Sequence, residues 1–119
     1  MYKIAIVDDE KDILSILQRY LSRDFEIETF ENPLEALSAI GNGNYDLVLS
    51  DIMMPQIDGI ELLKRLRDND CNVKVIMMTA FDTMDRALAA HKYGATNYIK
   101  KPFISLDDVK AKIIEELKH

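Results

Sequence analysis

The sequence predicts an α/β protein in which helices cover both faces of a parallel β-sheet. Short apolar runs recur along the chain, and segments with helical periodicity separate them. Such runs are typical of strands buried on both faces, and regular alternation of strand and helix favours parallel strands joined by helical crossovers. The chain has 119 residues, 48% of them hydrophobic, which suffices for one domain with its own core, expected to span residues 1–119.

The first half of the chain contains three predicted strands. Residues 4–7 and 47–50 form short apolar runs, whereas residues 25–30 mostly alternate between apolar and polar, as a half-buried edge strand does. The residues between the first two strands have the spacing of one helix face, made by Ile13, Leu14, Leu17, Tyr20 and Leu21.

The second predicted helix has clear start and stop signals. Asn32 provides an N-cap, Pro33 occupies the first helical position, and Glu35 follows three residues after the cap. The Gly-Asn-Gly sequence at residues 41–43 is predicted to end this helix. The third strand follows, and then a loop with Pro55 leads to a helix whose buried positions are expected at Ile60, Leu63 and Leu66.

Two more strands and two more helices are predicted after residue 70. Residues 73–78 form a fourth apolar run, residues 82–93 form a helix that Gly94 ends, and residues 97–100 form a short fifth strand. Ser105 then provides an N-cap with an acid three residues on. The apolar face of the last helix consists of Val109, Ile113, Ile114 and Leu117.

Polar residues gather where the predicted strands end. In parallel α/β sheets, ligands bind beyond the carboxyl ends of the strands, at a topological switch point. The residues at these ends are Asp8 and Asp9 at the first strand, Asp51 at the third, Thr79 at the fourth and Lys101 at the fifth. Crowded carboxylates raise one another's pKa unless a cation neutralises them. Oxygen ligands suit Mg²⁺, and the lack of Cys or His near these strand ends disfavours zinc.

These groups suit phosphoryl transfer. The hydroxyl of Thr79 and the ammonium of Lys101 can bind phosphoryl oxygens, and a carboxylate such as that of Asp51 can act as the nucleophile. Each residue alone is commonly structural, because aspartate and threonine are frequent in turns and caps and lysine is usually a solvated charge. Their joint placement at one edge of the sheet is what indicates a site.

Five segments of the chain resemble the receiver domain of bacterial two-component response regulators. They are Ile-Val-Asp-Asp-Glu at residues 6–10, Leu-Ser-Asp-Ile-Met-Met-Pro at 49–55, Asp-Gly at 58–59, Met-Thr-Ala at 78–80 and Tyr-Ile-Lys-Lys-Pro-Phe at 98–103. The resemblance covers essentially the whole chain in order and spacing. It implies a doubly wound, flavodoxin-like (βα)₅ fold with a five-stranded parallel sheet in the order 2-1-3-4-5.

The resemblance also implies a role for each site residue. Asp51 matches the phosphoacceptor and Asp9 the acidic Mg²⁺ ligand, while Asp8 matches the residue that assists through the ion's water shell. Met53 matches the position whose backbone carbonyl binds Mg²⁺.

Three further positions complete the implied switch. Thr79 matches the hydroxyl residue that contacts the phosphoryl group, Lys101 the lysine that pairs with phosphoryl oxygens, and Tyr98 the aromatic switch position. The bond between Lys101 and Pro102 is expected to be cis.

The implied function is two-component signal transduction with Mg²⁺ as cofactor. A histidine kinase or histidine phosphotransfer protein donates the phosphoryl group, and the face of helix 4, strand 5 and helix 5 changes for a downstream protein. The chain is then expected to be a monomer or a phosphorylation-dependent dimer. It is expected not to be an enzyme, although it takes part in its own phosphorylation and dephosphorylation. The alternative is a receiver fold that binds proteins without being phosphorylated.

Two other classes are disfavoured by single positions. A Mg²⁺-dependent phosphatase with an Asp nucleophile needs a second Asp where this chain has Met53. A flavin- or nucleotide-binding protein needs a Gly- or Ser/Thr-rich loop after the first strand, where this chain has acids at residues 8–10.

The composition disfavours further classes. A net charge of −6 and a pI near 4.8 argue against direct nucleic-acid binding. No apolar stretch has the length of a membrane span, and no signal peptide is visible. Cys71 has no partner for an internal disulfide, so we expect a reducing, cytoplasmic compartment. The last helix ends with the chain, which favours a stand-alone protein over a domain cut from a longer one.

Two hypotheses concern individual side chains. Met53 and Phe81 lie two residues after Asp51 and Thr79, and their bulk is expected to hinder the water that hydrolyses an acyl phosphate. His91 is expected to be a partly buried packing residue rather than a pH sensor.

Overall fold

A computed structural model describes residues 1–80 and 90–118 of the chain. These residues form a sheet of parallel strands in the order β2-β1-β3-β4-β5, which confirms the predicted fold. The strands are β1 (Lys3–Val7), β2 (Glu26–Phe30), β3 (Leu47–Asp51), β4 (Lys74–Ala80) and β5 (Asn97–Lys101). The central strand is β3, and it ends at Asp51.

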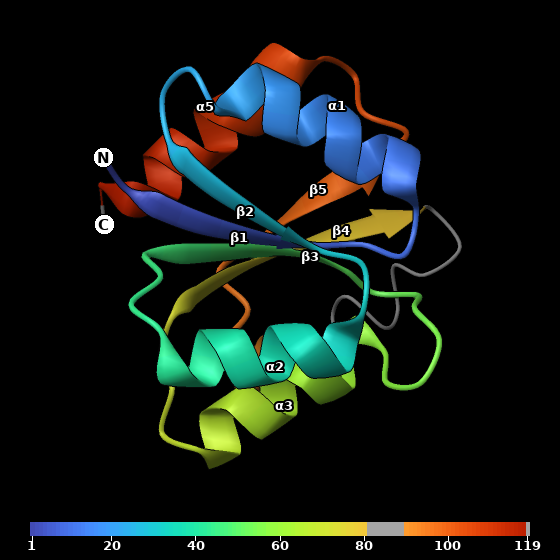
Figure 1. Cartoon of the computed structure of the whole chain (residues 1–119), viewed down its shortest axis with the longest axis vertical. Coiled ribbons are helices and arrows are strands. Elements are labelled where there is room, and N and C mark those ends of the chain that lie inside the picture. The colour runs from blue at the N-terminus through green and yellow to red at the C-terminus, as the bar shows by residue number, and fades with distance from the viewer. Residues whose placement is uncertain (81–89, 119) are drawn as a thin grey trace.

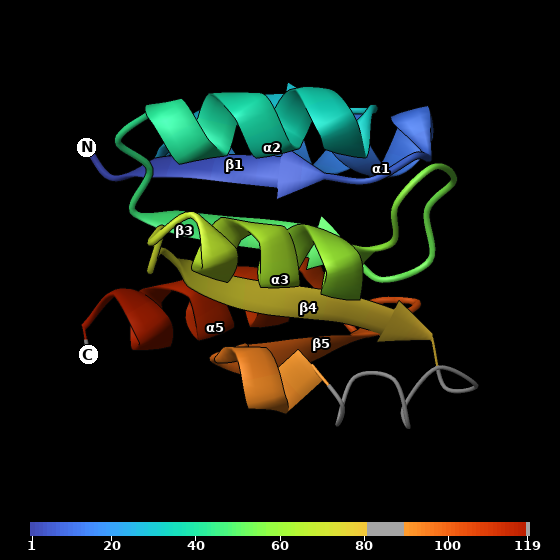
Figure 2. The ribbon, with the colours of Figure 1, turned by 90° about the horizontal axis from the view of Figure 1, so that it is seen from below.

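Helices cover both faces of this sheet (Figure 1). Helices α1 and α5 lie on one face, and α2 and α3 lie on the other. Their bounds are α1 (Lys11–Leu21), α2 (Pro33–Asn42), α3 (Gly59–Asp68) and α5 (Leu106–Leu117), with a short 3₁₀ turn, η2 (His91–Tyr93), before β5. Figure 2 shows the strands side by side, with both chain termini at the end of the sheet opposite the arrowheads.

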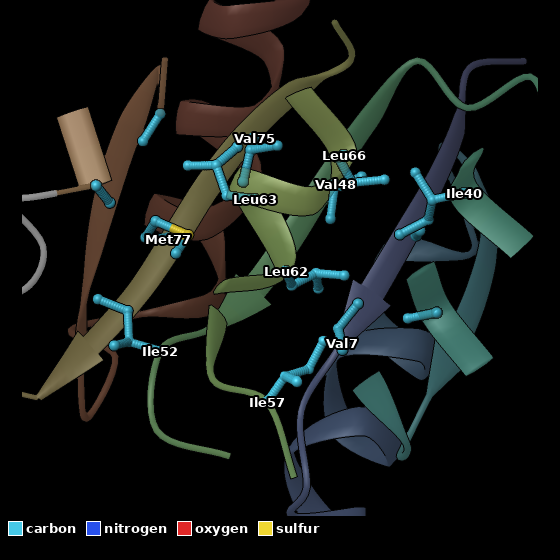
Figure 3. Packing of buried hydrophobic residues seen from close by; sticks show 14 residues of the cluster. Val7, Ile40, Val48, Ile52, Ile57, Leu62, Leu63, Leu66, Val75 and Met77 are labelled. Atoms are coloured by element: carbon cyan, nitrogen blue, oxygen red, sulfur yellow. The ribbon is translucent and has the colours of Figure 1, made fainter. Parts of the chain in front are cut away.

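Each face of the sheet has its own apolar core. Figure 3 shows the cluster beneath α2 and α3, where Val48 and Met77 of the sheet meet Leu62 and Leu66 of α3. Neighbouring strand residues such as Leu49 belong to the cluster beneath α1 and α5 instead. Because successive side chains of a strand point to opposite faces, a strand covered on both faces must be apolar throughout. The short apolar runs of the sequence are therefore strands between two layers of helices.

The predicted helix caps are confirmed. The side chain of Asn32 accepts a hydrogen bond from the Leu34 amide at 2.8 Å, and that of Ser105 accepts one from the Asp108 amide at 3.0 Å. Gly94 ends the η2 turn in the left-handed conformation, with φ of 83°. Residues 81–89, which contain most of the helix predicted over 82–93, lie outside the described residues.

Most of the finer predictions are confirmed, and one was wrong. The Gly-Asn-Gly sequence at residues 41–43 does end α2, since the last helical residue is Asn42 and Gly43 is the C-cap. In α3 the buried positions are Leu62, Leu63 and Leu66, whereas Ile60 is only half-buried at the first turn. The Lys101–Pro102 peptide bond is cis, as expected.

Strands β4 and β5 extend beyond their apolar runs. β4 includes Thr79 and Ala80, and β5 includes Lys101. The backbone ladder between the two strands pairs Thr79 with Lys100 and Ala80 with Lys101. Since ladder hydrogen bonds use only the backbone, a strand does not have to end where its apolar side chains end.

Within the part of the chain that the structure describes, no helix is both long enough and apolar enough to cross a membrane.

Candidate functional site

Four carboxylates gather at the carboxyl ends of β1 and β3. Asp8, Asp9, Glu10 and Asp51 each offer one oxygen, and these oxygens all lie within 4.8 Å of one another. The strands β1 and β3 are adjacent, with Val7 paired to Ser50, so the residues that follow these two must lie side by side. Asp8 is fully buried and Asp51 is 6% exposed, whereas Asp9 and Glu10 are exposed.

Lys101 supplies a positive charge to this cluster from the end of β5. Its ammonium nitrogen lies 2.7 Å from Asp8 Oδ2, 3.3 Å from Asp51 Oδ2 and 3.7 Å from Glu10 Oε1. Burial by itself lowers the pKa of Lys101, but the hydrogen bond to Asp8 and the charges of Asp8 and Asp51 outweigh it, so the pKa is raised overall. The lysine therefore stays charged at neutral pH.

The charge balance of the site remains negative. The pKa of Asp51 is raised from its ordinary 3.8 to about 6, because burial and then the charge of Asp8 raise it by more than Lys101 lowers it. A single ammonium thus does not compensate the carboxylates around it. Two buried or nearly buried acids at this short distance are stabilised by a further cation.

The donor set of the cluster fits a hard divalent cation. It consists of carboxylate oxygens, and among the described residues no histidine or cysteine belongs to it. Hard cations such as Mg²⁺ take oxygen ligands, whereas zinc prefers sites with nitrogen or sulfur. The exposed Asp9 and the nearly buried Asp51 can therefore contribute to one metal site from two different strands.

Thr79 lies on β4, the strand next to β3. Asp51 pairs with Met78 in the ladder, which places Thr79 one residue further toward the carboxyl edge. Thr79 is 1% exposed, and its hydroxyl donates a hydrogen bond to the carbonyl oxygen of Ala80 at 3.0 Å. The hydroxyl is thus at the edge of the sheet where the carboxylates gather.

Tyr98 lies on β5, three residues before Lys101. Its hydroxyl is buried and has no hydrogen-bond partner among the described residues. Burial raises the pKa of this phenol. The ring packs at the edge of the cluster beneath α2 and α3, so Tyr98 is separate from the carboxylates and belongs to the core on the β5 side.

The loop between β3 and α3 passes very close to the site. A Cβ atom at Gly59 would lie 2.1 Å from the carbonyl oxygen of Asp51, and the Gly59 amide donates to the Ile52 carbonyl at 2.8 Å. The Asp58 side chain caps α3 by accepting from the Glu61 amide at 2.8 Å. Only a residue without a side chain fits at position 59. The sequence alone predicts no role for Gly59, and the Asp-Gly pair at residues 58–59 is its only local signal of this close approach.

A second contact that the sequence did not predict orders the residues around Asp51. The hydroxyl of Ser50 donates to the carbonyl oxygen of Asp51 at 3.0 Å, within the buried part of β3. A serine at the end of an apolar run gives no sequence signal for this contact. It helps to hold the backbone from which the Asp51 carboxylate projects.

The structure brings most of the predicted site residues together. Asp8, Asp9, Asp51 and Lys101 meet directly. The side chain of Met53 is 52% exposed, in the loop after β3, and the role of its carbonyl stays a prediction. Phe81 lies outside the described residues.

The expectation for His91 was wrong. The residue is exposed rather than partly buried, and it lies in the short 3₁₀ turn η2 before β5.

Comparison with curated proteins finds relatives over nearly the whole chain. The chain is 37% identical over 117 residues to DNA-binding transcriptional regulator NtrC of Escherichia coli strain K12, an alignment that covers 98% of this chain and 25% of that protein. It is 33% identical over 112 residues to response regulator MprA of Mycobacterium sp. strain KMS, covering 93% of this chain and 48% of that protein. The chain therefore spans at most about half the length of these relatives.

Solved structures agree with the fold over the same span. The receiver domain of the Francisella response regulator 1452 has a TM-score of 0.90 and 32% identity, covering 99% of this chain and 98% of that chain. A CheY-like receiver domain protein from Methanospirillum hungatei JF-1 has a TM-score of 0.91 and 32% identity, covering 99% and 94%. Residues 4–114 also match the family described as the response regulator receiver domain. A match of this extent, on the fold just described, shows that the chain belongs to the response regulator receiver domain family of two-component systems.

Proposed function

We propose that the chain is a phosphorylation-controlled switch in which Asp51 accepts a phosphoryl group from a phosphohistidine. The main observation in support of this proposal is the position of the Lys101 ammonium, 2.7 Å from Asp8 and 3.3 Å from Asp51. It supplies a cation for phosphoryl oxygens at the end of the central strand, beside an Asp51 carboxylate that can act as nucleophile.

Mg²⁺ is the proposed cofactor. Asp9 and Asp51 would hold it directly, Asp8 would act through its water shell, and the Met53 carbonyl would be a further ligand. When bound, the ion neutralises the carboxylates and the charge on the transferring phosphoryl group. The oxygen-only donor set supports this choice.

The transfer itself is assigned to residues of the chain. A carboxylate oxygen of Asp51 forms a bond to phosphorus while the bond from phosphorus to the donor nitrogen breaks, and the electron pair of that bond goes to the nitrogen. Lys101 is held nearby and pairs with a phosphoryl oxygen. We propose no further substrate, so the chain takes part only in its own phosphorylation and dephosphorylation.

Thr79 and Tyr98 are the proposed switch residues. The Thr79 hydroxyl can exchange its bond to the Ala80 carbonyl for a phosphoryl oxygen. The buried Tyr98 hydroxyl has no partner among the described residues, so no such hydrogen bond fixes the position of its ring. A shift of Thr79 can therefore change how Tyr98 packs, and with it the surface around β5 and α5. A monomer, or a dimer formed on phosphorylation, would present this surface to a downstream protein.

A groove beside the site is the proposed place for the phosphodonor protein. It has a volume of about 550 Å³ and is lined mainly by apolar residues. They come from α1, from the segment between β5 and α5 and from the start of α5, among them Ile13, Ile16, Phe103 and Leu106. Lys101 and Glu10 line the same groove, so it opens directly onto the site. A histidine kinase or phosphotransfer protein that docked there would bring its phosphohistidine to Asp51.

Intact mass spectrometry after incubation with a small phosphodonor tests the proposal. We expect one added phosphoryl group on the wild-type chain, dependent on Mg²⁺ and absent from Asp51→Asn. A folded protein that gains no phosphoryl group from an active donor would contradict the proposal and favour a receiver fold that only binds proteins.

A further inference from the structure

Glu10 is the solvent-facing member of the three carboxylates that surround Lys101. Its Oε1 lies 3.7 Å from the Lys101 ammonium, and its side chain is 62% exposed. The side chains of the other two, Asp8 and Asp51, are 0% and 9% exposed. Any molecule that approaches Asp51 from solvent on the Lys101 side therefore meets the charge of Glu10 first.

The local backbone fixes the position of Glu10. Its amide donates to Asp8 Oδ1 at 2.9 Å, and its carbonyl accepts from the Leu14 amide in the first turn of α1 at 3.2 Å. The residue thus lies between a buried carboxylate and the start of a helix. These bonds fix the backbone of Glu10, and the exposed carboxylate contacts the Lys101 ammonium at 3.7 Å.

Glu10 also lines the groove beside the site. Lys101 and Ala80 share this lining, and most of the remaining residues are apolar. In an in-line displacement, the leaving atom lies on the side of phosphorus opposite the attacking oxygen. Since Asp51 is nearly buried at the end of β3, the leaving atom would lie on the solvent side, where Glu10 is exposed.

We propose that Glu10 selects among phosphodonors by the charge on their leaving atom. This inference rests on the proposed phosphorylation of Asp51. When a protonated phosphoramidate reacts, the new bond joins an Asp51 oxygen to phosphorus, the nitrogen–phosphorus bond breaks, and its electron pair turns the positive nitrogen into a neutral amine. When an acyl phosphate reacts, the oxygen–phosphorus bond breaks instead and the electron pair leaves as a carboxylate anion.

The two leaving atoms carry opposite partial charges in the transition state. A carboxylate close to them attracts the nitrogen, which is still partly positive, and repels the oxygen, which is becoming negative. Glu10 therefore favours nitrogen-linked donors, the class to which phosphohistidine belongs, over small acyl phosphates. The substrate class of the site is set in part by a residue that makes no bond to phosphorus.

The test compares second-order rate constants of phosphorylation by phosphoramidate and by acetyl phosphate at saturating Mg²⁺. In Glu10→Gln we expect the rate with acetyl phosphate to rise and the rate with phosphoramidate to fall, so that their ratio changes about three- to tenfold. Glu35→Gln is the matched control, because Glu35 is exposed and lines a different cleft with Asp9. It removes the same charge and should leave the ratio unchanged.

Each outcome decides the matter. Equal changes for both donors in Glu10→Gln would mean that Glu10 acts only by positioning Lys101 or a metal ion, and would overturn the inference. The inference would also be overturned if Glu10→Gln lost Mg²⁺ affinity, measured by calorimetry, and both rates fell in parallel. Failure of the wild-type chain to react with either donor would instead overturn the proposed function, and this inference with it.

Discussion

The ammonium of Lys101 lies 2.7 Å from Oδ2 of Asp8, a contact between residues 93 positions apart in the chain. It joins the end of β5 to the end of β1, although these strands are not neighbours in the sheet. Asp8 is fully buried, so its carboxylate is shielded from water and Lys101 is its partner of opposite charge. The same lysine also approaches Asp51 at 3.3 Å, so one side chain contacts both the buried Asp8 and the proposed phosphoacceptor.

Replacement of Lys101 should destabilise the metal-free protein. Lys101→Met leaves the buried carboxylate of Asp8 without its cation, and we expect a loss of about 1–3 kcal/mol in the free energy of unfolding, measured by urea denaturation. Lys92→Met, at an exposed position, is the control and should change little. A second variant that combines Lys101→Met with Asp8→Asn should recover much of the loss; no recovery would show that the ion pair is not the cause.

Asp51 should destabilise the metal-free fold at neutral pH. Its pKa is raised from 3.8 to about 6, first by burial and then by the charge of Asp8. The unfolded chain therefore loses this proton at lower pH than the folded chain does. The resulting loss of folding stability is absent below pH 3.8, grows between pH 3.8 and about pH 6, and is complete above about pH 6.

Asp51→Asn should remove this cost. One pKa unit corresponds to about 1.4 kcal/mol, and solvent at the mouth of the site reduces the effect, so we expect a gain of about 1–2 kcal/mol at pH 7.5 in a chelating buffer. The gain should shrink toward zero near pH 4, as thermal denaturation at several pH values will show. A gain that is equal at both pH values would contradict the assignment to a titrating carboxylate. Added Mg²⁺ should stabilise the wild type more than the variant.

Gly59→Ala should disturb the loop that supports Asp51. The added Cβ would meet the Asp51 carbonyl oxygen at 2.1 Å, so the backbone must move. We expect a loss of about 1–3 kcal/mol in stability and slower phosphorylation. Gly41→Ala is the matched control, because nothing lies within 4 Å of its Cβ and the residue is inside α2. This control should gain about 0.5–1 kcal/mol; similar losses in both variants would exclude the close approach as the cause.

Met53→Asn should shorten the lifetime of the phosphoryl group. The Met53 side chain is 52% exposed beside the site and can obstruct the water that attacks the acyl phosphate. A smaller polar side chain removes the obstruction and can orient the water, so we expect dephosphorylation to become several-fold faster, on the order of 1 kcal/mol in the barrier. The decay of the phosphorylated form by intact mass measures it. An unchanged decay rate would refute the obstruction.

Ile16→Asp should separate donor docking from phosphoryl chemistry. Ile16 is 46% exposed on α1 and lines the groove beside the site. A charge there should weaken docking of an apolar protein surface, so transfer from a phosphohistidine protein should fall about tenfold or more. Phosphorylation by acetyl phosphate should be unchanged. Leu34→Asp, at a similarly exposed position on α2, should affect neither reaction; equal losses from both variants would place the docking surface elsewhere.

The sequence by itself determined the order of the elements and the chemistry of the strand ends. Apolar runs such as residues 47–50 can be buried on both faces only between two layers of helices, so they predicted the parallel sheet. Local signals such as Asn32 and Ser105 also predicted caps that the structure confirms. These features depend on near neighbours in the chain, and a single sequence contains that information.

Only the tertiary structure decided how the strand-end residues meet and what surrounds them. The sequence placed Lys101 at the site by its position after the fifth strand, but its distances to Asp8, Asp51 and Glu10 depend on how three strands twist and pack. The lack of space at Gly59 likewise arises from a loop that folds back onto β3. Distances across a sheet follow from the packing of the whole core and are not encoded in any local pattern, so the contacts of Glu10 and Gly59 are visible only in the fold.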